Sequence, residues 1–140
     1  MTQMQDPARV RIRRRVEWAQ TDAAGHHHWT AVLHWAEQAE TVLHERLGIA
    51  DVTFGREPRV NATVDFTERL YFREDVDVDF AVEHVGTTSA RYAFTVSRNG
   101  VTAARGTLAT VLVDPGSGRP SPWPDALRTA LTEGGEQQPG

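Results

Sequence analysis

Thr30 to Leu47 read TAVLHWAEQAETVLHERL, the stretch of this chain with the clearest helical periodicity. Thr30 can cap the start of a helix here, and Gly48 supplies a C-terminal stop. The apolar residues recur at spacings of three and four, as on one face of an α-helix; they are Val32, Leu33, Trp35, Ala36, Ala39, Val42, Leu43 and Leu47. Because this apolar stripe is wide, we expect the rest of the fold to cover the helix.

The segments on either side of the helix alternate between apolar and polar residues, as β-strands do. One such run precedes the helix at residues 10–18, and others follow it at residues 60–66, 76–83 and 91–96. Asn99-Gly100 predicts a tight hairpin turn, after which a strand returns over residues 101–113. A strand, a helix and four antiparallel strands predict an α+β domain in which one helix covers one face of a sheet.

The length of 140 residues is enough for one domain with a single core. We expect a flexible N-terminus over residues 1–8, the domain itself over 9–131 and a disordered tail over 132–140, with a short helix from Pro124 to Leu131. A sheet with only one covering helix leaves edges that a second copy can pair with. We therefore predict a homo-oligomer, either a dimer or a tetramer.

Composition excludes several classes of protein. The net charge of −4 is mild and argues against a nucleic-acid-binding surface, which needs a clustered basic excess. No apolar run approaches the ~20 residues of a membrane span, and the N-terminus lacks the apolar segment of a signal peptide. The absence of cysteine excludes disulfides, zinc–thiolate sites and cysteine nucleophiles. A cytoplasmic protein without nucleic-acid or membrane partners fits these features.

The loop from Trp18 to Trp29, WAQTDAAGHHHW, joins the first strand to the helix. It places a carboxylate, three histidines and two tryptophans where a helix N-terminus exposes free backbone N–H groups. Such groups stabilise the oxyanion that forms when an acyl group is attacked. We interpret the loop as a candidate active site, although Asp22 can also serve simply as a turn-forming aspartate before Gly25.

The motif Trp18-x-x-Thr21-Asp22-Ala23-x-Gly25, followed by the helix and four strands, resembles the hotdog fold. More narrowly, it resembles the 4-hydroxybenzoyl-CoA thioesterase-like acyl-CoA thioesterases. Residues 66–76 are similar to the second strand of that family and the turn after it, and Gly86-x-x-Ser89-x-Arg91 is similar to the entry to its fourth strand. The resemblance covers residues 9–114. It implies a long central helix wrapped by a five-stranded, mainly antiparallel sheet.

The resemblance also implies an activity and two catalytic groups. Asp22 would act as nucleophile or as general base for water, and the backbone N–H of Trp29 would polarise the thioester carbonyl. The substrate would be an acyl-CoA or acyl-carrier-protein thioester, cleaved to a carboxylic acid and a thiol. No cofactor is implied beyond the coenzyme A of the substrate, which a second subunit would partly hold. The Trp29 side chain stands where many relatives carry tyrosine or histidine.

Other residues are expected to contact the substrate: Trp18, Gly25, His26, His28 and Arg91. Arg91, like Arg73, could meet the CoA phosphates with its planar fork of donors. The three histidines replace a mostly apolar stretch of the family, which suggests a more polar acyl pocket. Adjacent residues of an extended segment point to opposite faces, so three consecutive histidines do not easily ligate one ion, and no metal site is predicted. His34, Trp35 and His44 are expected to be packing or surface residues.

Two other functions fit parts of the same pattern. Asp22 and His27 are five residues apart, the spacing of the acidic residue and histidine in hotdog enoyl-CoA hydratases and dehydratases. That family pattern normally carries Asn-Pro between them, where this chain has Ala24-Gly25. The other alternative is a non-catalytic acyl-binding protein. The sequence leaves open the acyl group, the choice of CoA or carrier protein, and the nucleophilic or general-base role of Asp22.

Overall fold

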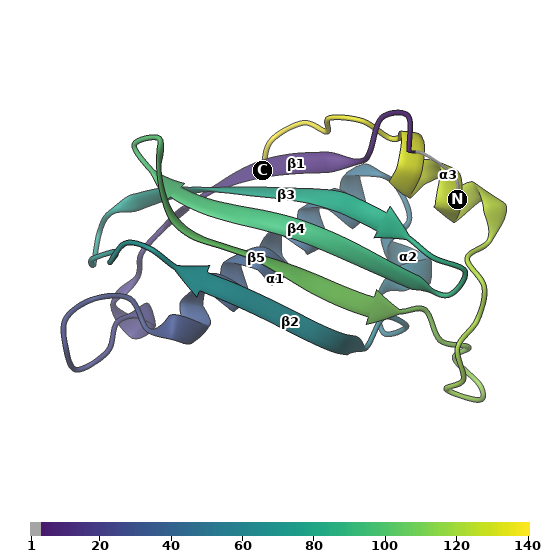
Figure 1. Ribbon diagram of the computed structural model, residues 1–140, viewed down its shortest axis with the longest axis horizontal. Coiled ribbons are helices and arrows are strands. Elements are labelled where there is room, and N and C mark those ends of the chain that lie inside the picture. The colour runs from purple at the N-terminus through teal and green to yellow at the C-terminus, as the bar shows by residue number, and fades with distance from the viewer. Residues whose placement is uncertain (1–3) are drawn as a thin grey trace.

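One five-stranded antiparallel sheet, with a long helix across one of its faces, makes up most of the chain (Figure 1). The computed structural model describes residues 4–140. The strands lie in the order β1-β3-β4-β5-β2, and every neighbouring pair is antiparallel. This arrangement confirms the predicted α+β class. In chain order the elements are β1 (Arg9–Arg15), the 3₁₀ turn η1 (Trp18–Gln20), α1 (Trp29–Arg46), α2 (Ala50–Thr53), β2 (Arg59–Phe66), β3 (Asp75–Val85), β4 (Ser89–Arg98), β5 (Val101–Val111) and α3 (Asp125–Glu133).

Helix α1 buries the apolar face that its periodicity predicts. Val32, Trp35, Ala39 and Leu43 are fully buried, and the helix packs against β1 and β3. Side chains at spacings of three and four share a face, so a single stripe fills the space above the sheet. Gly48 follows the helix with a φ of 72°, a backbone conformation that favours glycine and ends the helix as predicted.

The β4–β5 hairpin turns at Asn99-Gly100, as the sequence predicts. Their φ angles are 50° and 80°, the left-handed values that a two-residue hairpin turn requires at both positions. Gly106 in β5 is needed for a different reason. A side chain there would collide with the carbonyl oxygen of Thr63 in β2 and with the ring of Phe94 in β4. Glycine therefore lets β2 close onto the sheet at this point.

The two edges of the sheet differ. Residues 135–140 run beside β1, where backbone hydrogen bonds of 2.8–3.1 Å join them to Arg9, Arg11 and Arg13 (Figure 1). The structure thus differs from the disordered tail predicted for residues 132–140, because the unpaired backbone groups of an edge strand give the tail partners. On the opposite edge, β2 is exposed along most of its length, including Val60 and Phe66.

Other predicted boundaries also change. Strand β1 stops at Arg15 rather than Trp18. The N–H of Val16 still bonds to the carbonyl of Glu74 at 2.8 Å, and the turn η1 then begins at Trp18. Of the predicted flexible segment 1–8, residues 1–3 lie outside the described residues. Ala8 is buried, and its N–H donates to the carbonyl of Leu131 at 3.0 Å. The short helix α2 was not predicted, and α3 runs two residues past Leu131.

The helices of residues 4–140 include none that combines the length and the apolar character needed to cross a membrane.

Candidate active site

The loop between η1 and α1 folds into a tight turn headed by Asp22. The backbone N–H of Asp22 donates to the carbonyl of His26 at 2.9 Å, and one carboxylate oxygen, Oδ1, accepts the N–H of Ala24 at 2.8 Å. Gly25 has a φ of 90°, which permits the turn. The other oxygen, Oδ2, lies 3.7 Å from Nδ1 of His26. Asp22 is therefore a turn-forming residue that still leaves one carboxylate oxygen outside the turn.

The N-terminus of α1 is capped by His28 and not by Thr30. The imidazole Nδ1 of His28 accepts the N–H of Thr30 at 3.2 Å and contacts its hydroxyl at 2.7 Å. The imidazole can take this place because Nδ1 reaches back to the second amide of the helix as a serine or threonine oxygen would. Trp29 is the first helical residue, so its N–H has no acceptor within the helix.

A cavity of about 810 Å³ brings these two features together. The loop and the start of α1 form one wall, the segment that follows β2 forms another, and the end of β4 closes it. The lining residues are Asp22, His26, His27, Trp29, Phe66, Thr67, Glu68, Arg69, Tyr71 and Arg98. Asp22, His26 and Trp29 thus share one cavity.

His27 is a lining residue that the sequence interpretation placed only in the hydratase alternative. It is buried, and its ring Nδ1 accepts the backbone N–H of Leu70 at 3.0 Å. The backbone N–H of His27 donates to the Leu70 carbonyl at 2.7 Å. An Nδ1 that accepts carries no proton, so the neutral ring has its N–H on Nε2. Burial, followed by the neighbouring His26, lowers the pKa of His27 and favours this neutral form.

An ion pair supports the far wall of the cavity. Arg98 donates to both carboxylate oxygens of Glu74 at 3.0 and 3.1 Å and to the carbonyl of Arg69 at 3.0 Å. Glu74 also accepts the N–H of Tyr71 at 2.6 Å. The sequence interpretation identified residues 66–76 only as a family motif, and their role in the wall follows from these contacts to the end of β4.

Four predicted substrate contacts lie elsewhere or take other roles. Trp18 is 73% exposed and packs edge-on against Phe72, with ring centroids 5.5 Å apart, outside the cavity lining. His28 lines a separate hollow of about 260 Å³ on the other side of the loop. Arg91 is exposed on β4 beside Glu83, at 3.5 Å, and does not line the cavity. Gly25 shapes the loop through its backbone.

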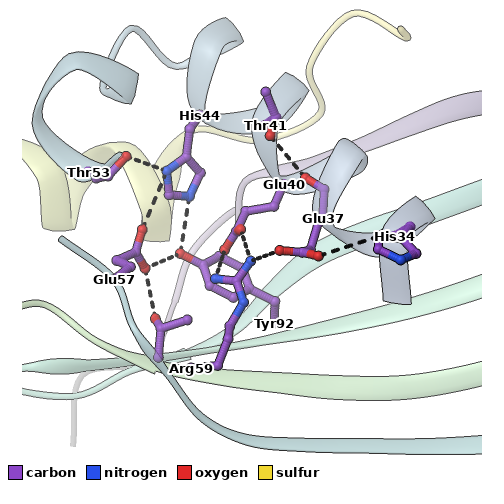
Figure 2. A network of polar contacts seen from close by, with 10 residues as sticks. His34, Glu37, Glu40, Thr41, His44, Thr53, Glu57, Arg59 and Tyr92 are labelled. Atoms are coloured by element: carbon purple, nitrogen blue, oxygen red, sulfur yellow. Dashed lines mark hydrogen bonds and ion pairs between the residues drawn. The ribbon is translucent and has the colours of Figure 1, made fainter. Parts of the chain in front are cut away.

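A second polar cluster lies beneath the C-terminal half of α1 (Figure 2). Within residues 4–140, potential ligand atoms of Glu40, His44 and Glu57 come within 4.8 Å of one another, close enough to share a metal ion. These atoms already have protein partners. Arg59 pairs with both oxygens of Glu40, and Tyr92 bonds to both His44 and Glu57. The cluster is therefore a hydrogen-bonded network of the protein's own groups.

Comparison with known proteins places the fold in a family. A model of the thioesterase-like superfamily matches residues 16–131. A solved structure of a predicted thioesterase from Bacillus stearothermophilus is 29% identical, with a TM-score of 0.83 and coverage of 94% of this chain and 99% of that one. A thioesterase from Thermus thermophilus, complexed with coenzyme A and Zn, is 26% identical, with a TM-score of 0.81 and coverage of 91% and 94%.

A third solved structure, a 1,4-dihydroxy-2-naphthoyl-CoA thioesterase from Synechocystis, is 18% identical, with a TM-score of 0.80 and coverage of 89% and 96%. At this identity the likeness concerns the fold alone. Comparison with curated proteins gave no match. The family match and the structural likeness confirm the hotdog fold expected from the sequence.

Proposed function

The chain belongs to the thioesterase-like superfamily, and we propose that Asp22 and the first turn of α1 carry out its thioester hydrolysis. One observation supports this assignment above the others. Asp22 and Trp29 line the same cavity, so a carboxylate and the first residue of α1, whose N–H has no acceptor within the helix, border a common space. The reaction converts an acyl thioester and water to a carboxylic acid and a thiol.

The substrate carbonyl lies over the first turn of α1. Attack on this carbonyl places negative charge on its oxygen, and the N–H of Trp29 donates to that oxyanion. The positive end of the helix dipole favours the same charge. A single donor of this kind contributes about a hundred- to a thousandfold in rate. The role needs only the backbone, so tryptophan at this position is compatible with it.

Asp22 acts through the oxygen that the turn does not use. Because the N–H of Ala24 engages Oδ1, Oδ2 is the oxygen that attacks the carbonyl or accepts a proton from water. The hydrogen bond to Ala24 also restrains the carboxylate, so the attacking oxygen keeps its orientation. His26 lies 3.7 Å from Oδ2 and bounds the space on that side.

The leaving group needs little assistance. A thiolate departs readily from the tetrahedral intermediate, so Asp22 and the oxyanion donor suffice and no bound metal or cofactor enters the scheme. Coenzyme A as the thiol is supported by the Thermus thermophilus thioesterase, which is described as complexed with coenzyme A. The Nε2–H of His27 and the phenol of Tyr71 give the cavity polar groups, which suits an acyl group that carries its own hydrogen-bonding atoms.

The site is expected to form in a homodimer that pairs through β2. The tail closes the edge of β1, whereas β2 offers an exposed edge at which a second copy can add. Antiparallel pairing about a two-fold axis brings the Phe66 end of one β2 beside the Arg59 end of the other. Phe66 lines the Asp22 cavity, so the partner's Arg59 would approach its mouth.

The direct test is release of free thiol from a panel of acyl-CoAs by the Asp22→Asn protein. The chain contains no cysteine, so it contributes no thiol background to this assay. We expect the native protein to release thiol and the variant to lose nearly all of this activity. Hydration of an enoyl-CoA without thiol release would identify a hydratase instead, and binding without turnover would identify a non-catalytic acyl-binding protein.

A further inference from the structure

Five residues from five segments form a buried hydrogen-bonded chain that the proposed reaction does not use. His44 comes from α1, Thr53 from α2, Glu57 from the loop before β2, Tyr92 from β4 and Thr110 from β5. We call these residues the Glu57 cluster (Figure 2). The side chains of His44 and Glu57 are 1% and 6% exposed, and neither lines the Asp22 cavity.

The hydrogen bonds run in one line, and a longer contact of 3.6 Å joins Oε2 of Glu57 directly to Nδ1 of His44. The Oε1 atom of Glu57 contacts the hydroxyls of Thr110 at 2.7 Å and Tyr92 at 2.9 Å. The Tyr92 hydroxyl contacts Nε2 of His44 at 3.1 Å, and Nδ1 of His44 contacts the hydroxyl of Thr53 at 2.6 Å. The Thr53 hydroxyl also lies 3.2 Å from the carbonyl of Ile49, where the line ends. Each hydroxyl has one hydrogen, so the direction of one bond dictates the next.

An ionised Glu57 orients the line one way. Its carboxylate can only accept, so Tyr92 donates its hydrogen to Glu57. The Tyr92 oxygen must then accept from Nε2–H of His44. The other nitrogen, Nδ1, is left as an acceptor and takes the hydrogen of Thr53. The Thr53 hydroxyl then has no hydrogen left to donate to the Ile49 carbonyl, so that hydrogen bond is lost.

A protonated Glu57 orients the line in the opposite way. Its hydroxyl donates to the Tyr92 oxygen, Tyr92 donates to Nε2 of His44, and Nδ1–H of His44 donates to Thr53. Thr53 then donates to the Ile49 carbonyl, so every contact in the line has a hydrogen. Thr110 donates to Glu57 in both arrangements. His44 remains neutral throughout and changes only the nitrogen that carries its hydrogen.

The surroundings decide which group holds the proton. Burial raises the pKa of Glu57 to about 7, helped by the charge of Glu40 and opposed by the hydroxyls of Thr110 and Tyr92 and by the charge of Arg59. Burial, followed by Arg59, lowers the pKa of His44 to about 4. Both shifts favour a neutral acid beside a neutral imidazole over a buried ion pair. Glu37, which is also in α1, contacts Arg59 at 3.5 Å.

We propose that the Glu57 cluster is a one-proton switch, in which release of a proton from Glu57 reverses the hydrogen bonds along Tyr92, His44 and Thr53. His44 changes tautomer in this transition without becoming an imidazolium. The ionised state places two carboxylates, Glu57 and Glu40, near each other and loses the bond from Thr53 to Ile49. The loop at residues 54–58, which leads into β2, is therefore held less firmly above neutral pH.

The experiment is nitrogen-15 NMR of the histidine rings in the full chain, from about pH 5 to about pH 9. The His44 signals are assigned by their loss in His44→Gln. We expect the Nδ1–H tautomer at low pH and the Nε2–H tautomer at high pH, with a midpoint near neutral pH. An imidazolium signal from His44, or one unchanged tautomer across the range, would overturn the proposal.

Three variants test the direction of cause. Glu57→Gln removes the titrating group, so His44 should keep one tautomer at every pH. Tyr92→Phe removes the hydroxyl that links the two residues by hydrogen bonds and leaves only their 3.6 Å contact, so Glu57 should still titrate while the His44 tautomer no longer follows it. Glu45→Gln is the matched control, because Glu45 is an exposed residue next to His44 in α1 and its variant should keep the full transition. A transition that persists in Glu57→Gln would assign the proton to another group. These outcomes do not depend on thioesterase activity.

Discussion

Helix α1 has a carboxylate and a histidine at each end, in opposite environments. At the N-terminus, Asp22 and His26 are about 30% and 28% exposed, and one oxygen of Asp22 is outside its turn. Near the C-terminus, Glu57 and His44 are almost fully buried, and both bond to Tyr92. The first pair borders the cavity that we propose as the substrate site. The second pair lies between five segments of the same chain.

The difference shows how the setting of a carboxylate determines its use. An acid that must attack or accept a proton needs an unoccupied oxygen and access to the reacting atom. The ionisation of an acid that is buried among hydrogen-bonding groups is coupled to their arrangement and to folding. Mutations at the two ends should therefore separate catalysis from stability.

The largest expected effect is on the rate of hydrolysis in Asp22→Asn. The amide oxygen can still accept the N–H of Ala24, so the turn is kept while the attacking oxygen is lost. We expect the rate of thiol release to fall by about 10²–10⁴-fold, the usual contribution of a general acid or base. The free energy of unfolding, measured in urea, should change by less than about 0.5 kcal/mol.

Asp114→Asn is the matched control for that change. Asp114 also heads a turn, where its Oδ2 accepts the N–H groups of Gly116 and Ser117 at 3.1 and 2.8 Å. It is exposed and outside the cavity, so the variant should hydrolyse thioesters at the native rate. Equal losses in the two variants would mean that Asp22 acts through its turn and not through its free oxygen.

The next effect concerns the proposed dimer. Its paired β2 strands would bring the Asp22 cavity of one subunit close to the Arg59 end of β2 in the other. Ala62 lies near the middle of β2, so two copies of Ala62→Arg would face each other close to the two-fold axis. Opposed like charges at such an interface cost several kcal/mol, and analytical ultracentrifugation should show a shift to monomer. Ala62→Ser is the neutral control. A dimer that survives Ala62→Arg would place the interface elsewhere.

A smaller effect is a pair of opposite pH dependences at the buried end. The pKa of Glu57 is raised to about 7, so its contribution to stability is present at low pH and is lost as pH rises toward that value. The pKa of His44 is lowered to about 4, so its contribution is present above the pKa of a free histidine and is lost as pH falls. In the native protein the two contributions change stability in opposite directions over the pH range that they share.

Each single variant should expose one slope. Glu57→Gln keeps only the His44 slope, so its stability should rise with pH between about 4 and 6.5, whereas His44→Gln keeps only the Glu57 slope and should lose stability between about 4.5 and 7. We expect changes of the order of 1–3 kcal/mol over these ranges, measured by urea unfolding at a series of pH values. Slopes of the same sign in both variants would contradict the assignment of the proton to Glu57.

The sequence predicted the exposed end of α1 better than the buried end. The Asp22 turn is built from neighbouring residues, Asp22 to His26, so its chemistry is visible in one short motif. The Glu57 cluster joins residues up to 66 positions apart in the chain, and none has a local pattern that indicates the others. His44 could only be predicted as a helix residue that packs or faces solvent.

The same contrast explains the outcome for the fold. Helical periodicity and the Asn99-Gly100 turn are local, and the structure has both within one or two residues. The position of the tail depends on the open edge of β1, with which the tail forms backbone hydrogen bonds. His27 lines the cavity because it bonds to Leu70, a contact between distant segments. These long-range bonds were not predictable from periodicity or composition.

The smallest expected effect tests the cap at the N-terminus of α1. His28→Ala removes the acceptor for the N–H of Thr30 and should lower the free energy of unfolding by about 1 kcal/mol, the typical value for loss of an N-cap. His28 does not line the Asp22 cavity, so thiol release should stay close to the native rate. His28→Asn restores an acceptor of similar reach and should recover most of the stability. A large loss of activity with unchanged stability in His28→Ala would instead make this side chain part of the catalytic end, because a cap acts on the helix and not on the substrate.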